Sequence, residues 1–214
     1  MKTVFITGVS RGLGRAIAKE FSARGFETIG VARSTCEIDS VRTFQLDVCD
    51  ETAVTEFIAS LEKLDVVVNN AGIARYRPLL ETPTSELREV LEVNVVGAFN
   101  VMREAARRMA GEGGGQIINI ASDAAVKGIA NMAPYVASKH ALLGMARSVS
   151  EEMKGQGVRV CTYCPGPMDT EILGPGSKNP KALQPGDIAK TIVHLAELPE
   201  RMDVQEILVE PAEG

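Results

Sequence analysis

The chain has 214 residues, of which 45% are apolar and 24% are charged, and its formal net charge is −5. That length and apolar content are enough to bury one substantial core, so we expect a single domain over residues 1–214. The acidic balance gives no electrostatic support to a nucleic-acid partner, and the densest cationic cluster, Arg103, Arg107 and Arg108, reads as a solvated helix face. No apolar run is long enough for a signal sequence or a membrane span, so we expect no membrane partner.

Short apolar runs typical of strands alternate along the chain with longer segments of helical periodicity. The predicted strands cover residues 3–7, 27–32, 43–46, 65–69, 116–121, 158–164 and 206–209. The predicted helices cover residues 12–24, 51–61, 85–109, 134–154 and 187–198. This alternation predicts an α/β fold with a parallel sheet between two layers of helices. An irregular stretch rich in proline and glycine, at about 167–185, is expected to be a loop over a site.

The cysteines bear on the compartment and on metal binding. The chain contains Cys36, Cys49, Cys161 and Cys164, and without an export signal they are expected to be reduced thiols in a cytoplasmic protein. The last two form a Cys-x-x-Cys, a spacing found in redox motifs and in half of a zinc site. They lie in a predicted strand, where residues three apart face opposite sides, and no second pair exists. Structural cysteines and no metal are therefore expected.

A glycine-rich turn joins the first predicted strand to the first predicted helix. A glycine turn that opens a helix presents backbone N–H groups and the positive end of the helix dipole to an anion. Glycine also lets a pyrophosphate approach the backbone closely. The spacing Gly-x-x-x-Gly-x-Gly therefore predicts phosphate binding, rather than a turn that binds nothing. The residues expected to contact the phosphates are Gly8, Ser10, Arg11, Gly12, Leu13 and Gly14.

The same segment also matches the Gly-x-Ser-x-Gly nucleophile elbow of serine hydrolases, with Ser10 as nucleophile. Asp169 or Asp187, followed by His194, would supply the chain order of a triad. An elbow on the first strand, however, leaves no earlier strand to supply the oxyanion loop. The hydrolase is kept as a remote alternative.

The end of the second strand discriminates between cofactors. A carboxylate there would bind a ribose 2′-hydroxyl and indicate NAD, but the strand ends Ala32-Arg33-Ser34. Arg33, joined by Arg11 from the turn, offers guanidinium groups to a 2′-phosphate. NADP(H) is therefore favoured over NAD(H); the alternative is two surface arginines without a ligand.

Tyr135 and Lys139 are four residues apart, which places them on one face of a helix. A fixed cation favours the phenolate, so we expect Lys139 to lower the pKa of Tyr135 and make it a usable proton donor. Ser122 precedes the tyrosine by thirteen residues and would complete the group. Alone, the Tyr-x-x-x-Lys spacing also fits a helix face with a solvated lysine.

These segments together resemble the short-chain dehydrogenase/reductase superfamily in its compact form. Asp47-Val48, Asn69-Asn70-Ala71-Gly72 and Pro165-Gly166 occur in the family's order, as do the glycine turn and the Ser122, Tyr135 and Lys139 set. The resemblance implies a Rossmann-like doubly wound sheet of about seven strands, order 3-2-1-4-5-6-7. It also implies further cofactor contacts from Asp47, Val48, Asn70, Ala71, Gly72, Tyr135, Lys139, Pro165, Gly166, Met168 and Thr170.

The resemblance further implies hydride transfer between nicotinamide and a small carbonyl or alcohol. Tyr135 would donate the proton, Lys139 would bind the nicotinamide ribose, and Ser122 would hold the substrate oxygen. Asn94 would hold a water that links Lys139 to solvent. The substrate would be an aldehyde, a ketone or a 3-oxo or 3-hydroxy acid, with a 3-oxoacyl thioester as an alternative. An NADP(H) sensor without turnover is the alternative from another class. Relatives pair through the helices at 85–109 and 134–154, so a homotetramer or a dimer is expected.

Overall fold

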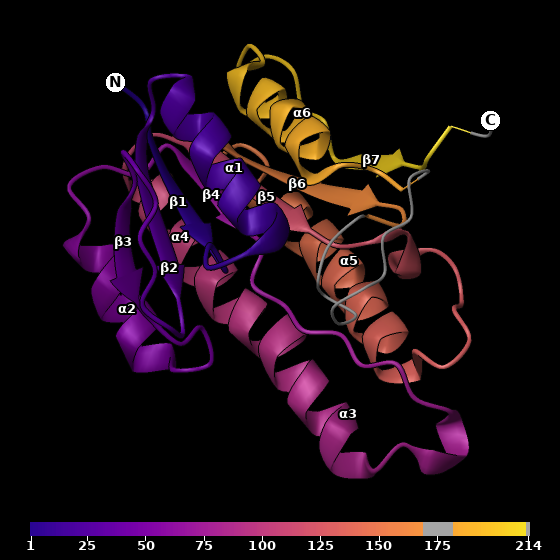
Figure 1. The fold of residues 1–214 in the computed structure, drawn as a ribbon. Helices are drawn as coiled ribbons and strands as arrows, with labels where there is room; N and C mark the ends of the chain where they lie inside the picture. Colours follow the sequence, from indigo (N-terminus) through magenta and orange to yellow (C-terminus); the bar gives the residue numbers. More distant parts are fainter. Residues whose placement is uncertain (169–181, 213–214) are drawn as a thin grey trace.

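The computed structural model describes residues 1–168 and 182–212, in which seven strands form one sheet (Figure 1). Every strand pairing is parallel, and the order is β3-β2-β1-β4-β5-β6-β7. The predicted fold class and strand order are therefore confirmed. The strands are β1 (Thr3–Thr7), β2 (Glu27–Ala32), β3 (Arg42–Gln45), β4 (Val66–Asn69), β5 (Gly115–Ile120), β6 (Val158–Pro165) and β7 (Glu206–Val209).

Helices cover both faces of this sheet. The α-helices are α1 (Gly12–Ala23), α2 (Glu51–Ser60), α3 (Thr84–Leu91), α4 (Ala98–Gly111), α5 (Ala133–Met153) and α6 (Pro185–Glu197). Short 3₁₀ turns occupy η1 (Leu79–Glu81) and η3 (Asp123–Ala125). Helices α1 and α6 pack on one face, and α2, α4 and α5 pack on the other (Figure 1). Each face therefore has its own apolar core, as a doubly wound sheet requires.

The spacing of apolar residues explains how the helices dock. Leu13, Ile17 and Phe21 recur every four residues on α1, and all three are buried against the sheet. Helix α2 begins at the carboxylate of Asp50, which accepts a hydrogen bond from the backbone N–H of Ala53 at 3.0 Å.

The helix predicted over 85–109 is present but is not a uniform α-helix. Helical structure runs from α3 into α4 through a π-helical segment, η2 (Glu92–Gly97). Asn94, which is 1% exposed, lies in that segment. A π-turn accommodates one extra residue in a helix and occurs frequently at functional sites. Apolar periodicity is almost unchanged by one wider turn, so the sequence does not reveal it.

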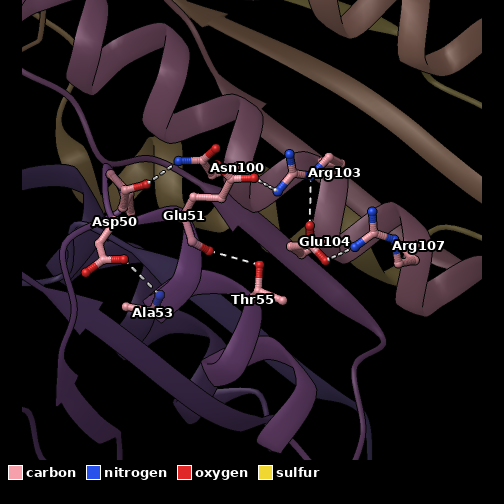
Figure 2. A network of polar contacts seen from close by, with 9 residues as sticks. Asp50, Glu51, Ala53, Thr55, Asn100, Arg103, Glu104 and Arg107 are labelled. Carbon is pink, nitrogen blue, oxygen red and sulfur yellow. Dashed lines mark hydrogen bonds and ion pairs between the residues drawn. The ribbon is translucent and has the colours of Figure 1, made fainter.

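The arginine cluster on α4 is only in part the solvated face expected from the sequence, because Arg107 is exposed whereas Arg103 and Arg108 are partly buried. Figure 2 shows Glu104, which is 5% exposed, between the guanidinium groups of Arg103 and Arg107. Arg103 also donates to Glu51 of α2 at 2.8 Å, and Arg108 donates to the backbone oxygen of Ile58 at 2.6 Å. Arg103 and Arg108 therefore tie α4 to α2, while Arg103 and Arg107 supply the charged partners that the buried Glu104 carboxylate needs.

The cysteines lie as expected. Cys161 packs with α1 and α6 and Cys164 with the opposite core, so the two thiols face opposite sides of β6. All four cysteines are free. Within residues 1–168 and 182–212, the helices are too short or too polar to cross a bilayer.

Candidate active site

A cavity of about 750 Å³ opens along the carboxyl ends of the central strands. Parallel strands present their carboxyl ends at one edge, so loops far apart in sequence meet there. Most of the predicted cofactor residues line it. They are Gly8, Ser10, Arg11, Gly12, Leu13, Gly14, Arg33, Asp47, Val48, Asn70, Ala71, Gly72, Tyr135, Lys139 and Met168.

Five other predicted residues lie beside this cavity or cannot be placed. Asn94 and Ser122 are buried behind the cavity wall, and Pro165 and Gly166 are buried or nearly so at the end of β6. Thr170 lies outside the described residues, as does most of the loop expected at 167–185.

The glycine turn adopts a backbone that other residues resist. Gly8 and Gly12 have φ values of 76° and 55°, in the left-handed region that favours glycine. A Cβ on Gly14 would collide with the backbone oxygen of Gly8 and the amide nitrogen of Asn70. The turn is therefore held close against the end of β4, which leaves the start of α1 facing the cavity.

Thr7 connects the glycine turn to the loop that follows β4. The sequence pattern does not single out Thr7 for this role. Its hydroxyl oxygen accepts hydrogen bonds from the backbone N–H groups of Asn70, at 3.0 Å, and Ala71, at 2.9 Å. The side-chain nitrogen of Asn70 donates a hydrogen bond of 2.9 Å to the backbone oxygen of Thr7. The ends of β1 and β4 are thus joined where a dinucleotide would cross the sheet. Strand alternation marks Thr7 as buried but does not reveal its partners.

The cavity is cationic where it passes the end of β2 and the start of α1. The side chains of Arg11 and Arg33 are exposed and both line the cavity. Among the described lining residues Asp47 is the only carboxylate, and it accepts a hydrogen bond from the backbone N–H of Cys49 at 3.0 Å. The end of β2 therefore offers guanidinium groups and no acid, as the sequence indicates.

Tyr135 and Lys139 face the other end of the cavity from α5. Lys139 is 5% exposed, its ammonium lies 5.6 Å from the centroid of the Tyr135 ring, and it donates to the backbone oxygen of Ile120 at 2.9 Å. Burial lowers the pKa of Lys139 to about 8. Burial also raises the pKa of Tyr135 to about 12, and a hydrogen bond with Ser122 opposes this only in part. The expected lowering of the tyrosine pKa is not met, because loss of solvent and the charge of Asp123 raise this pKa by more than Ser122 lowers it.

Ser122 lies at the end of β5, where its hydroxyl is held by its neighbours. The hydroxyl donates to the carboxylate of Asp123 at 2.7 Å and accepts from the backbone N–H of Ala124 at 3.2 Å. Ser122 is 8% exposed, and it lies close enough to Tyr135 to lower the pKa of the phenol. The serine, tyrosine and lysine are thus brought together, as the spacing predicts.

Asn94 joins three segments behind these residues. Its side-chain oxygen accepts from the backbone N–H of Ile73 at 2.8 Å. Its side-chain nitrogen donates to the backbone oxygen of Ile73 at 2.9 Å and to the hydroxyl of Ser138 at 3.0 Å. Both amide hydrogens are therefore used, and the side chain fixes the loop after β4 against α5.

The hydrolase alternative finds no support in this geometry. Ser10 lines the cavity, but neither Asp187 nor His194 does, and His194 is exposed on α6. Asp169 lies outside the described residues.

Comparison with known proteins agrees with this geometry. A family model of the short chain dehydrogenases matches residues 2–181. The 3-oxoacyl-[acyl-carrier-protein] reductase MabA of Mycobacterium avium is 36% identical over 175 residues, covering 80% of this chain and 69% of that protein. The 2,3-dihydro-2,3-dihydroxybenzoate dehydrogenase of Escherichia coli is 33% identical, over 98% of this chain and 95% of that protein. The solved structure of ElxO with NADP bound has a TM-score of 0.89 at 27% identity, covering 98% of this chain and 97% of that one. The chain therefore belongs to the short chain dehydrogenase family, whose members are NAD(P)-dependent oxidoreductases that act on CH–OH groups.

Proposed function

We propose that the protein transfers hydride between NADP(H) and a small carbonyl or alcohol, with residues 1–214 forming one cofactor-binding and catalytic unit. One observation carries the proposal: Tyr135 and Lys139 line the same cavity as the glycine turn. The N–H groups at the start of α1 would hold the phosphates of a nucleotide in that cavity, and Tyr135 would supply a proton donor beside its reactive end. When bound, the cofactor supplies or accepts the hydride.

The residues present fit this cofactor. Gly8 and Gly12 hold the turn open with left-handed backbones, so its N–H groups can meet a pyrophosphate. Lys139 has three donors and uses one on Ile120, which leaves two for ribose hydroxyls. Asp47 lines the same cavity, where its carboxylate would approach the adenine.

NADP(H) is preferred over NAD(H) on the charge of the cavity rim. Arg11 and Arg33 are exposed there, and among the described residues neither is paired with a carboxylate. Two guanidinium groups can bind a 2′-phosphate, and their attraction for a bare 2′-hydroxyl is much weaker. The NADP bound to ElxO supports the same preference.

In the reducing direction, Tyr135 donates its proton to the substrate oxygen. Its high pKa in the buried site keeps the phenol protonated, as a proton donor must be. Once its proton has turned from Asp123 to the substrate, Ser122 hydrogen-bonds the same oxygen, and a bond of this kind to a developing charge is typically worth about 3 kcal/mol. Lys139 stays largely protonated at neutral pH, because its lowered pKa of about 8 is still above 7.

Asn94 orders the path by which the proton is resupplied. Its amide is committed to Ile73 and Ser138, so a water linking Lys139 to solvent would be held by the second lone pair of the side-chain oxygen or by the backbone oxygen. The π-turn favours the second arrangement, because it displaces backbone carbonyls from the regular helical pattern.

The substrate is proposed to be a small aldehyde, ketone, or 3-oxo or 3-hydroxy acid. Similarity to the Mycobacterium avium reductase favours a 3-oxoacyl thioester as the second candidate. A nucleotide sensor without turnover is the alternative from another class, and it would give the proton-donor geometry no role.

Exposed apolar surface and the state of the cysteines bear on the oligomer and on the compartment. Val96 and Phe99 expose apolar surface on the helical segment that begins α4, and a homotetramer or dimer would cover it. The four free thiols fit a reducing cytoplasm.

Two measurements test the proposal. NADPH and NADH titrations followed by fluorescence should show tighter binding of NADPH, and replacing Arg33 with serine should remove most of the difference. A carbonyl panel of cyclohexanone, benzaldehyde and ethyl acetoacetate should then reveal NADPH consumption.

The variant Tyr135→Phe separates an enzyme from a sensor. It removes the proton donor while keeping the ring, so turnover should fall at least about a thousandfold while NADPH binding changes little. Turnover near the level of the unmodified protein would refute the role of Tyr135. NADPH binding without turnover on any carbonyl would favour the sensor.

A further inference from the structure

An ion-paired chain of side chains leads from the active-site serine to the end of the sheet. The carboxylate of Asp123, which is 4% exposed, accepts the hydroxyl of Ser122 at 2.7 Å and pairs with Lys127 at 2.9 Å. Lys127 also pairs with Glu210 at 3.0 Å, just after β7. Glu210 in turn lies against Gly166, at the end of β6.

These contacts fix the position of the Asp123 carboxylate. Its backbone begins η3, and its carboxylate also accepts the backbone N–H of Ala124 at 2.8 Å. The ammonium of Lys127 pairs with the other oxygen of this carboxylate. An ionised carboxylate only accepts hydrogen bonds, so the proton between Asp123 and Ser122 belongs to the serine.

Counting the bonds of Ser122 shows what it can still bind. A hydroxyl has one proton to donate and two lone pairs that accept. The proton points at Asp123, and one lone pair accepts from Ala124. One acceptor position remains, and no donor. In this arrangement Ser122 can accept a hydrogen bond from the hydroxyl of an alcohol or of Tyr135, but it has no hydrogen to donate to a carbonyl oxygen.

We propose that Asp123, fixed by Lys127 and Glu210, is a positioning residue that orients the hydroxyl of Ser122 as an acceptor, so that the site favours binding of an alcohol over the matching carbonyl. A carbonyl substrate binds to Ser122 only after the serine proton leaves Asp123, which gives up a charge-assisted hydrogen bond. The role of Asp123 rests on the proposed function, because Ser122 meets a substrate oxygen only if the protein carries out the proposed hydride transfer.

The test compares the two directions of one reaction. The carbonyl of the panel that is reduced fastest and its own alcohol are used as the substrate pair, and KM is measured for each. Asp123→Ala frees the serine proton and should raise the ratio of the alcohol KM to the carbonyl KM at least about tenfold, given the usual strength of a hydrogen bond to a charged group. Asp123→Asn keeps a neutral acceptor and should raise the ratio by a smaller factor.

Lys190→Met is the matched control. Lys190 forms an exposed ion pair with Asp187 at 3.3 Å on α6, outside the residues that line the cavity, so its loss should leave both KM values unchanged. Thermal melting verifies that each variant is folded, and Asp123→Asn carries the test if the alanine variant does not fold. Because the equilibrium of the reaction does not depend on the enzyme, kcat must shift in the compensating sense, which checks the KM values.

The failure of this inference differs from failure of the proposed function. A KM ratio that stays within about twofold in folded Asp123 variants, whether or not turnover falls, overturns the orienting role and leaves hydride transfer in place. Absence of turnover in the unmodified protein overturns the function, and the role of Asp123 with it.

Discussion

The burial of Lys139 makes the stability of the protein depend on pH in an unusual direction. Its pKa is lowered from 10.5 to about 8, because burial removes water from the ammonium and little charge compensates. Below about pH 8 the lysine is protonated in both the folded and the unfolded chain. Between about pH 8 and 10.5 only the unfolded chain keeps the proton. Since the unfolded state then binds more protons, the free energy of unfolding rises with pH across this window and is level above it.

The size of this effect follows from the two pKa values. A change in proton affinity costs about 1.4 kcal/mol for each factor of ten, so the full shift corresponds to about 3 kcal/mol. From pH 7 to pH 9.5 the expected gain is about 2 kcal/mol, because the folded lysine loses its proton over most of that interval. The variant Lys139→Met keeps an apolar side chain of similar length but has no ammonium group that could lose a proton.

The assay is urea unfolding of the cofactor-free protein and the variant at several values of pH. Other groups titrate in the same range, and burial raises the pKa values of Cys161 and Tyr163, but these contributions cancel in the difference between the two proteins. From pH 7 to pH 9.5, the free energy of unfolding of the unmodified protein should rise by about 2 kcal/mol relative to that of Lys139→Met. The bond from Lys139 to Ile120 is also lost, and that loss shifts the difference by a constant.

Lys19→Met is the matched control, because Lys19 is exposed on α1. Its difference from the unmodified protein should not change with pH. A flat difference for Lys139→Met as well would show that the ammonium is solvated in the folded protein and would refute the reasoning.

Two more predictions concern the turn and the helix junction. Gly14→Ala places a methyl group against backbone and amide atoms that cannot move aside, so NADPH binding should weaken at least about tenfold in fluorescence titration, whereas Gly144→Ala, whose added methyl group meets nothing within 4 Å, should bind normally. Unchanged affinity in the first variant would mean that the turn relaxes. Glu104→Gln removes a buried charge that two arginines hold, so the free energy of unfolding in urea should fall by about 2 kcal/mol. Glu151→Gln, which breaks an exposed pair, should cost less than about 0.5 kcal/mol, and equal losses would contradict the importance of burial.

The sequence predicts most of the fold and the membership of the site. Alternating strand and helix patterns are local signals, and they predict the parallel sheet with its two helical layers. The glycine turn and the spacing of Tyr135 and Lys139 are also local, because a turn and one helical face are fixed by neighbours in the chain. Cys161 and Cys164 face opposite sides of β6 for the same reason.

What the tertiary structure alone determines depends on burial and on partners far away in the chain. The pKa of Tyr135 is raised rather than lowered because other segments exclude water from it, which no spacing reveals. Asn94 finds Ile73 and Ser138, and Lys127 finds Glu210, 83 residues later, only after the sheet has formed. The protonation and hydrogen bonding of the site are therefore tertiary properties, because electrostatic free energies depend on the distances and solvent exposure that packing sets.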